Sequence, residues 1–432
     1  MKKVIQKLAL TLCLIMILTT FAGCGVKGTD EKVEDKGDYK NSGEKVELNY
    51  AFWNKEQEPI FRKLADEFEE KNPNIKVNIE IIPYEQYLTK LEVAAQGGTA
   101  PDLFWMNGPN FIKYAKSDVL KPLDSVIEKD SYNMSVYPES LVDLYTYEDS
   151  IYGMPLTWDT IGLFYNKEIF DEAGIDYPDE TWDWSKLEEV SKQLTDEDKG
   201  IWGIAATCTD QQGFYNTIFQ NNGYIVSDDK TESGYDKPET IKGVKCWVDL
   251  VDKGYSPTYE QMTDTKAEDL FASGKVAMMY AGSWMTIKFS NSETIANKYD
   301  IEILPKMENR ATVIHGVSNV MYEGTEYPEE TWKFMKFLSS KEAGEVLAKE
   351  VSLLPAHEGA LPAYFESDSG LNLEAFTKQA EYSYMYPTSL DTMKWLKLQQ
   401  EYMAKAWSGK MKVEEACNEL AEKMNEVLKN EK

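Results

Sequence analysis

The stretch 152-YGMPLTWDTIGLFYNKEIF-170 decides how the chain is organised, because it has the pattern of a crossing between two lobes. Gly153 and Pro155 interrupt regular secondary structure near its start. A run typical of a buried strand follows at 161–165, and Asn166-Lys167 then opens an amphipathic segment. The stretch therefore predicts a linker, a strand, a turn and a helix, in that order, at the beginning of a second lobe.

Several motifs in and around this stretch are similar to those of one protein family. They are Asn72-Pro73, Gly98-Thr99-Ala100-Pro101-Asp102, Tyr165-Asn166-Lys167, Phe170, Ala173-Gly174, Thr181-Trp182, Gly282-Ser283-Trp284 and His315-Gly316-Val317-Ser318-Asn319. With these motifs the chain resembles the extracellular solute-binding proteins of ABC importers, in the group whose members mostly bind sugars. The resemblance runs from about Val46 to the C-terminus. It implies a two-lobed α/β fold of the class II periplasmic-binding-protein type, with a hinge between the lobes.

Hydrophobic periodicity predicts alternating strands and helices before the crossing, which favours a parallel sheet covered by helices. The predicted strands are 46–53, 75–81, 101–106, 161–165, 201–204, 276–280 and 299–305. The predicted helices are 59–71, 84–96, 184–194, 214–220, 241–253, 263–273, 328–338, 373–384, 391–407 and 413–428. We expect three crossings between a first lobe, 46–154 with 305–352, and a second lobe, 155–304 with 353–432.

The N-terminus has the pattern of an export signal. Residues 1–23 combine three lysines with an apolar core at 8–18 that is too short for a stable membrane span. The small pair Ala22-Gly23 precedes Cys24, which resembles a bacterial lipoprotein signal and implies a palmitate-type lipid on Cys24. An ordinary secretory leader with an incidental cysteine is the alternative. Residues 24–45 are polar and charged, and they predict a flexible tether.

The composition argues against several classes of partner. The formal net charge is −28, which repels nucleic acid. Outside the leader and its cleavage point, Cys417 has the spacing of a helix core position, whereas a Cys208–Cys246 disulfide stays an open alternative. The chain has no HExxH or Cys-x-x-Cys motif, so neither a metal nor a cofactor is expected.

Aromatic and amide side chains gather at the predicted strand ends and crossings, and ligands bind beyond the carboxyl ends of the strands in such sheets. A flat ring offers an apolar face to a sugar, and Asn, Asp and His hydrogen-bond its hydroxyls. The expected ligand-binding residues are Trp53, Asn54, Trp105, Asn107, Trp158, Asp159, Trp284, His315 and Gly316. For Trp53, Trp105 and Trp158 a core position is an equally good interpretation, whereas the resemblance implies a ligand role for Trp284. The spacing of Trp395 favours a core position.

The resemblance implies a monomeric binding protein and no enzyme. Such a protein captures an extracellular carbohydrate, an oligosaccharide, and delivers it to an ABC permease, while a lipid at Cys24 holds it on the outer face of the cell membrane. One alternative is another solute, such as a polyol or a glycerol-phosphate diester; a phosphate would favour Arg or Lys in the cleft. The other is a tethered extracellular glycoside hydrolase, which needs two carboxylates across the cleft.

Overall fold

The computed structural model describes residues 45–351, 353–366 and 370–431, and these belong to one compact unit. The predicted leader, Cys24 and the predicted tether up to residue 44 lie outside the described residues. Within the described ranges, no helix combines the length and the apolar character needed to cross a bilayer.

The first lobe is built on parallel strands, as predicted. Strand β1 (Val46–Phe52) pairs with β2 (Ile75–Ile81) on one side and with β3 (Leu103–Asn107) on the other. Helices α2 (Glu58–Lys71) and α3 (Tyr84–Gln96) connect them, and α2 ends at Asn72, just before Pro73. Helix α2 turns one apolar face inward, so its burial follows the 3.6-residue period of the sequence.

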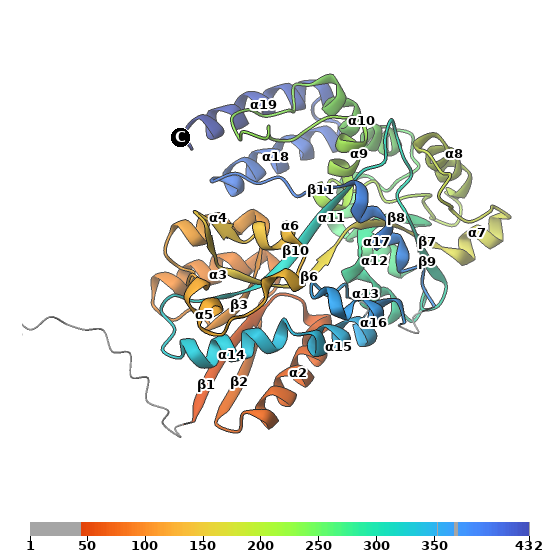
Figure 1. Ribbon diagram of the computed structural model, residues 1–432. Coiled ribbons are helices and arrows are strands. Elements are labelled where there is room, and N and C mark those ends of the chain that lie inside the picture. The colour runs from red at the N-terminus through yellow and green to blue at the C-terminus, as the bar shows by residue number, and fades with distance from the viewer. Residues whose placement is uncertain (1–44, 352, 367–369, 432) are drawn as a thin grey trace, which may run out of the picture. The chain divides into compact units, whose positions relative to one another are not determined.

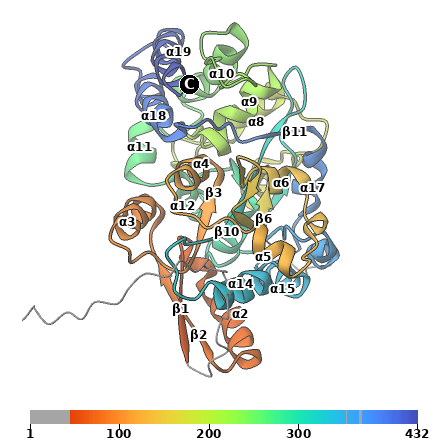
Figure 2. The same ribbon diagram turned by 60° about the vertical axis from the view of Figure 1, so that its left-hand side comes forward.

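Two long strands connect the lobes (Figures 1 and 2). Strand β10 (Thr312–Met321) runs antiparallel to β3 at one end and pairs with the short β11 (Ser383–Met385) at the other. Strand β6 (Gly153–Asp159) pairs antiparallel with β10 along its length. The prediction of an irregular linker was therefore wrong at Gly153 and Pro155. Proline cannot donate a hydrogen bond, and a shift in the strand register next to Pro155 accommodates it.

The second lobe holds a three-stranded antiparallel sheet in which β7 (Ile161–Asn166) lies between β8 (Met278–Gly282) and β9 (Tyr299–Glu302). Helix α7 (Lys167–Ala173) follows β7 directly. The Asn166 side chain accepts hydrogen bonds from the first backbone N–H groups of α7, and Gly174 ends the helix at a φ of 65°. The strand, turn and helix predicted from residue 161 onward are thus confirmed.

The remaining helices lie around the two sheets, and α18 and α19 lie beside each other (Figure 1). In the first lobe they are α4 (Gly108–Lys116), α5 (Asp124–Lys129), α6 (Glu139–Asp143), α14 (Pro328–Leu338) and α15 (Lys341–Val351), beside the small hairpin β4 (Thr146–Tyr147) and β5 (Ser150–Ile151). The others are α8 (Trp184–Leu194), α9 (Tyr215–Gln220), α10 (Pro238–Asp252), α11 (Tyr259–Asp264), α12 (Ala267–Ala272), α13 (Thr286–Ser290), α16 (Leu361–Phe365), α17 (Glu374–Lys378), α18 (Thr392–Trp407) and α19 (Val413–Lys429).

Three predicted elements differ in the structure. The predicted strand 201–204 makes only isolated β-bridges, and the predicted helix 263–273 is divided between α11 and α12. The predicted helix 373–384 ends early, in α17, a 3₁₀ turn and β11. There the Gln379 side chain bonds to the backbone of Ile161 and Leu304. These tertiary hydrogen bonds hold the chain against the second lobe, and they outweigh the helical preference of the segment.

Candidate functional site

A cavity of about 220 Å³ is lined by residues of both lobes, and we call it the Trp284 cavity. Its first-lobe residues, Asn54 and Glu56, follow the carboxyl end of β1. Its second-lobe residues include Trp284, which follows the carboxyl end of β8. The indole of Trp284 lies against Gly282, where a Cβ atom would come within 1.8 Å of the ring. The Gly-Ser-Trp sequence therefore fixes the position of the ring.

An aromatic group lies on the first-lobe side, next to Asn54. The half-buried Trp53 ring contacts the rings of Tyr84, at 5.5 Å between centroids, and of Trp105, at 5.0 Å. Trp105 itself is only 4% exposed, stacks on Phe52 and donates from Nε1 to the Tyr50 hydroxyl at 2.6 Å. The structure thus places Trp53 near the cavity and Trp105 in the core behind it.

Tyr84 is a candidate that the sequence analysis missed. Its ring is 47% exposed at the start of α3, and its hydroxyl accepts a hydrogen bond from Asn107 Nδ2 at 2.8 Å. Burial of that hydroxyl raises the pKa of Tyr84, and the negative charge of Asp210 raises it further. Asp210 belongs to the second lobe, so the two side chains are close across the lobes. Tyr84 lies shortly after the carboxyl end of β2. Because ligands bind beyond the carboxyl ends of the strands in such sheets, this position could have identified Tyr84 from the sequence.

Asp159 and His315 lie opposite each other on β6 and β10. Asp159 is 7% exposed and accepts a hydrogen bond from Gln211 Nε2 at 3.0 Å. Nε2 of His315 accepts the backbone N–H of Gly108, the first residue of α4, at 3.2 Å. The His315 ring also meets the Tyr386 ring edge-on. The crossing strands thus bring together two predicted residues that are 156 positions apart in the sequence.

Trp158 lies on the other face of this strand pair. Neighbouring residues of a strand point to opposite faces, so Trp158 and Asp159 cannot share one site. Trp158 lines a separate cavity of about 350 Å³, together with Leu141, Ile314 and Met385. A Cβ atom on Gly316 would come within 2.9 Å of the Leu141 side chain, so a glycine is needed for this packing. The structure therefore does not bring Trp158 or Gly316 to the Trp284 cavity, and of the predicted residues Asn54 and Trp284 form its lining.

A second acid, Asp210, is held in the π-helical turn Asp210–Phe214. Its Oδ2 accepts from the Tyr386 hydroxyl at 2.8 Å and from Gln399 Nε2 at 3.3 Å, and its Oδ1 accepts from the backbone N–H of Gln211 at 2.6 Å. Oε1 of Gln399 in turn accepts the hydroxyls of Tyr215 and Tyr235, both at 2.7 Å. The turn and helix α18 therefore fix Asp210 through side chains that are far apart in the sequence, which explains why no local motif revealed it.

The cysteines have a clear outcome. Cys208, Cys246 and Cys417 are free thiols, so the possible Cys208–Cys246 disulfide is not formed. Among the described residues, His, Cys, Asp and Glu side chains form no group of three or more that could hold a metal ion.

His315 should make the stability of the protein sensitive to acid. Burial lowers the pKa of His315 to about 4, and its Nε2 can accept from Gly108 only when it is unprotonated. The unfolded chain binds the proton more readily than the folded chain. The contribution of neutral His315 to the free energy of unfolding is therefore present above pH 6.5 and is lost as the pH falls. Between pH 6.5 and pH 5 the free energy of unfolding should fall by about 2 kcal/mol more in the wild type than in His315→Gln.

Urea unfolding at both pH values measures this difference. Burial raises the pKa of Asp159 and of Asp210, which acts in the opposite direction, but both acids are present in the two proteins and cancel in the comparison. Parallel pH profiles for the wild type and the variant would show that His315 is protonated equally in the folded and unfolded chain.

The profile of the family described as bacterial extracellular solute-binding proteins matches residues 63–372. The chain is 26% identical to the maltotriose-binding protein of Pyrococcus abyssi, over 76% of this chain and 70% of the relative. It is 24% identical to the galactooligosaccharide-binding protein of Bacillus subtilis, over 88% and 87%. The solved ABC substrate-binding protein Lmo0181 of Listeria monocytogenes, in complex with cycloalternan, is 29% identical, with a TM-score of 0.85 over 89% of this chain and 100% of that one.

Proposed function

The chain belongs to the bacterial extracellular solute-binding protein family, and we propose that its solute is a carbohydrate, specifically an oligosaccharide, which it delivers to an ABC permease. Relatives named for binding maltotriose and galactooligosaccharides support this choice of ligand class. The observation that carries the proposal is the Trp284 cavity, where an indole of one lobe and the Asn54 amide of the other line one space, with the Trp53 and Tyr84 rings next to Asn54.

The side chains around the cavity have complementary roles in sugar binding. The flat faces of Trp284, Trp53 and Tyr84 suit the apolar C–H faces of sugar rings, and the polar side chains suit the hydroxyls. We assign the ligand contacts to Trp53, Asn54, Tyr84, Asn107, Asp159, Asp210, Trp284 and His315. Trp105 supports this site from the core behind Trp53, whereas Trp158 and Gly316 belong to the opposite face of the β6–β10 pair.

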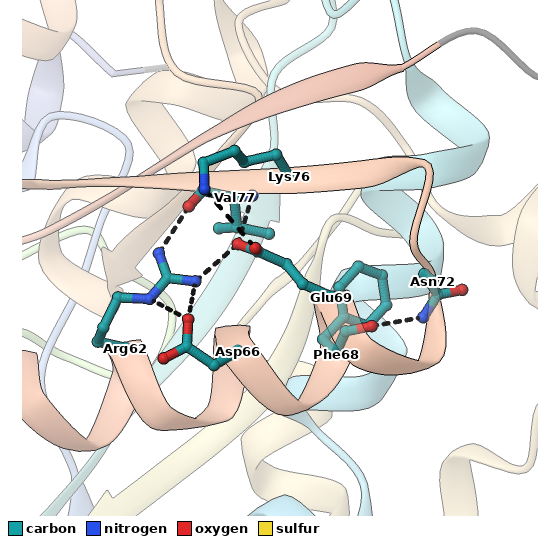
Figure 3. A network of polar contacts seen from close by, with 7 residues as sticks. All are labelled: Arg62, Asp66, Phe68, Glu69, Asn72, Lys76 and Val77. Atoms are coloured by element: carbon teal, nitrogen blue, oxygen red, sulfur yellow. Dashed lines mark hydrogen bonds and ion pairs between the residues drawn. The ribbon is translucent and has the colours of Figure 1, made fainter.

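The alternative of a phosphate-bearing solute is disfavoured by where the two arginines lie. Arg62 is held on α2: its guanidinium donates to Asp66 at 2.8 Å, to Glu69 at 2.6 Å and to the Val77 carbonyl at 2.7 Å (Figure 3). Arg310 donates to the backbone carbonyls of Glu180 and Leu304. Neither guanidinium lines the Trp284 cavity, whereas phosphate recognition commonly uses such a group.

The export signal supports the rest of the proposal. We assign a lipid anchor to Cys24 and a tether to residues 24–45, so that a monomer acts on the outer face of the cell membrane. Binding and release need no catalytic step and no cofactor. We also propose that the first lobe comprises residues 46–154 with 305–352, and the second lobe residues 155–304 with 353–432.

A thermal-shift screen of the purified protein tests the function. Mono- and oligosaccharides are compared with polyols and with a glycerol-phosphate diester. A saccharide at a hundred times its dissociation constant should stabilise the protein by about 2.7 kcal/mol. The bound saccharide should then be recovered intact by chromatography. A shift with the diester or a polyol alone, or recovery of a shortened saccharide, would overturn the proposal in favour of another solute or of a hydrolase.

A further inference from the structure

Two carboxylates that we assign to the ligand site, and that lie beyond the residues lining the Trp284 cavity itself, are held by uncharged donors. Asp159 accepts from the Gln211 amide, and Asp210 accepts from the Tyr386 hydroxyl, the Gln399 amide and a backbone N–H. Gln211 links the two acids, because its backbone bonds to Asp210 and its side chain to Asp159. Among the described residues, neither carboxylate has an ion-pair partner within 4.0 Å.

The basic groups that line the Trp284 cavity are already paired. Lys266 lies 3.0 Å from Glu85 of the opposite lobe. Lys288 lies 2.7 Å from Asp269 and 3.9 Å from Glu268. A negatively charged ligand would have to compete with these carboxylates for each ammonium group. Both lysines at the cavity are therefore already paired with carboxylates, and an anionic ligand would have to share them.

An acidic group on the ligand would meet a direct electrostatic penalty beside the two aspartates. Like charges repel more strongly where water is largely excluded, and Asp159 is 7% exposed. Burial already raises the pKa of both carboxyl groups, because removal from water disfavours the charged form. A second anion nearby would raise these pKa values further, so it would bind only against repulsion or together with a proton.

We propose that Asp159 and Asp210 select the ligand by charge, so that the site takes saccharides without acidic groups and rejects those that carry a carboxylate or a phosphate. This inference rests on the proposed function, since it names the class of saccharide. It assigns selection by charge to Asp159 and Asp210, which come from different segments of the chain. The aromatic rings, by contrast, select the ligand by shape.

The test uses the neutral saccharide that gives the largest thermal shift, together with the same saccharide oxidised to a uronate at one primary alcohol. Calorimetry at pH 8 should show that the uronate binds at least about tenfold more weakly to the wild type. Asp210→Asn keeps the shape of the side chain and removes its charge, and it should reduce this ratio to within about threefold. Asp159→Asn provides the same measurement at the second acid, and melting curves confirm that both variants fold.

Asp171→Asn is the matched control, because Asp171 also accepts a tyrosine hydroxyl, that of Tyr177 at 2.7 Å, but belongs to helix α7 and is not among the residues that we assign to the ligand site. In Asp171→Asn, the ratio of the affinities for the neutral saccharide and the uronate should equal that of the wild type. Equal or tighter binding of the uronate by the wild type would overturn charge selection. If this ratio were unchanged in both Asp159→Asn and Asp210→Asn, charge selection could not be assigned to these aspartates. Failure of every neutral saccharide to bind would instead refute the proposed function itself.

Discussion

Trp284→Ala should weaken oligosaccharide binding by on the order of a hundredfold or more, while the protein still folds. The indole is half-buried and forms part of the wall of the Trp284 cavity, so its removal takes away the second-lobe face on which a sugar ring can stack. Calorimetry with the saccharide identified by the screen measures the loss. Trp284→Phe keeps an aromatic face and should recover much of the affinity.

Trp202→Ala is the matched control for this loss. Trp202 is also a half-buried tryptophan of the second lobe, but its backbone bridges to Val276, just before the start of β8, whereas Trp284 follows the end of that strand. The affinity of Trp202→Ala should therefore equal that of the wild type. If Trp284→Ala instead lowered the melting temperature strongly and left the affinity of the folded fraction unchanged, Trp284 would be a core residue.

Trp395→Ala should destabilise the protein by about 3–5 kcal/mol, with little effect on affinity in the molecules that remain folded. Trp395 on α18 is 0% exposed, and its Nε1 donates to the Ser389 hydroxyl at 2.9 Å. Truncation would leave a large cavity in the second-lobe core and would remove one hydrogen bond from the Ser389 hydroxyl, which keeps its bond to Glu431. Urea unfolding followed by circular dichroism measures the loss of stability.

Trp395→Phe separates packing from hydrogen bonding at this position. It fills most of the volume and should cost clearly less than the alanine variant, because the cost of a core truncation grows with the cavity that it leaves. Unchanged unfolding of Trp395→Ala combined with lost saccharide binding would move Trp395 from the core to the ligand site.

The sequence predicted the architecture well where its periodicity was strong. Helix α2 and the strands on either side of it follow patterns with clear limits such as Asn72-Pro73, and the two-lobed fold expected from the family motifs is confirmed by the similarity to the solved substrate-binding protein. The short or broken segments were less predictable. In the predicted helix 373–384, hydrogen bonds from Gln379 to another part of the chain decide the conformation, and no local pattern records them.

The candidate site was only partly predictable. Residue type and strand-end position identified Asn54, and the family resemblance identified Trp284; both line the same cavity. The same reasoning could not distinguish Trp105, which a hydrogen bond to Tyr50 holds in the core, from the half-buried Trp53. Asp210 depends on a π-helical turn and on partners far along the chain, so its role becomes visible only in three dimensions.

The pairing of β6 with β10 has a consequence for ligands of different length. The ladder runs from His315 opposite Asp159 to Val320 opposite Gly153. Because β10 also pairs with β3 and β11, the ladder is part of a larger sheet, and its backbone pairing holds Asp159 and His315 at one mutual spacing. In the proposed function, a saccharide would therefore meet these two side chains at the same spacing whatever its length.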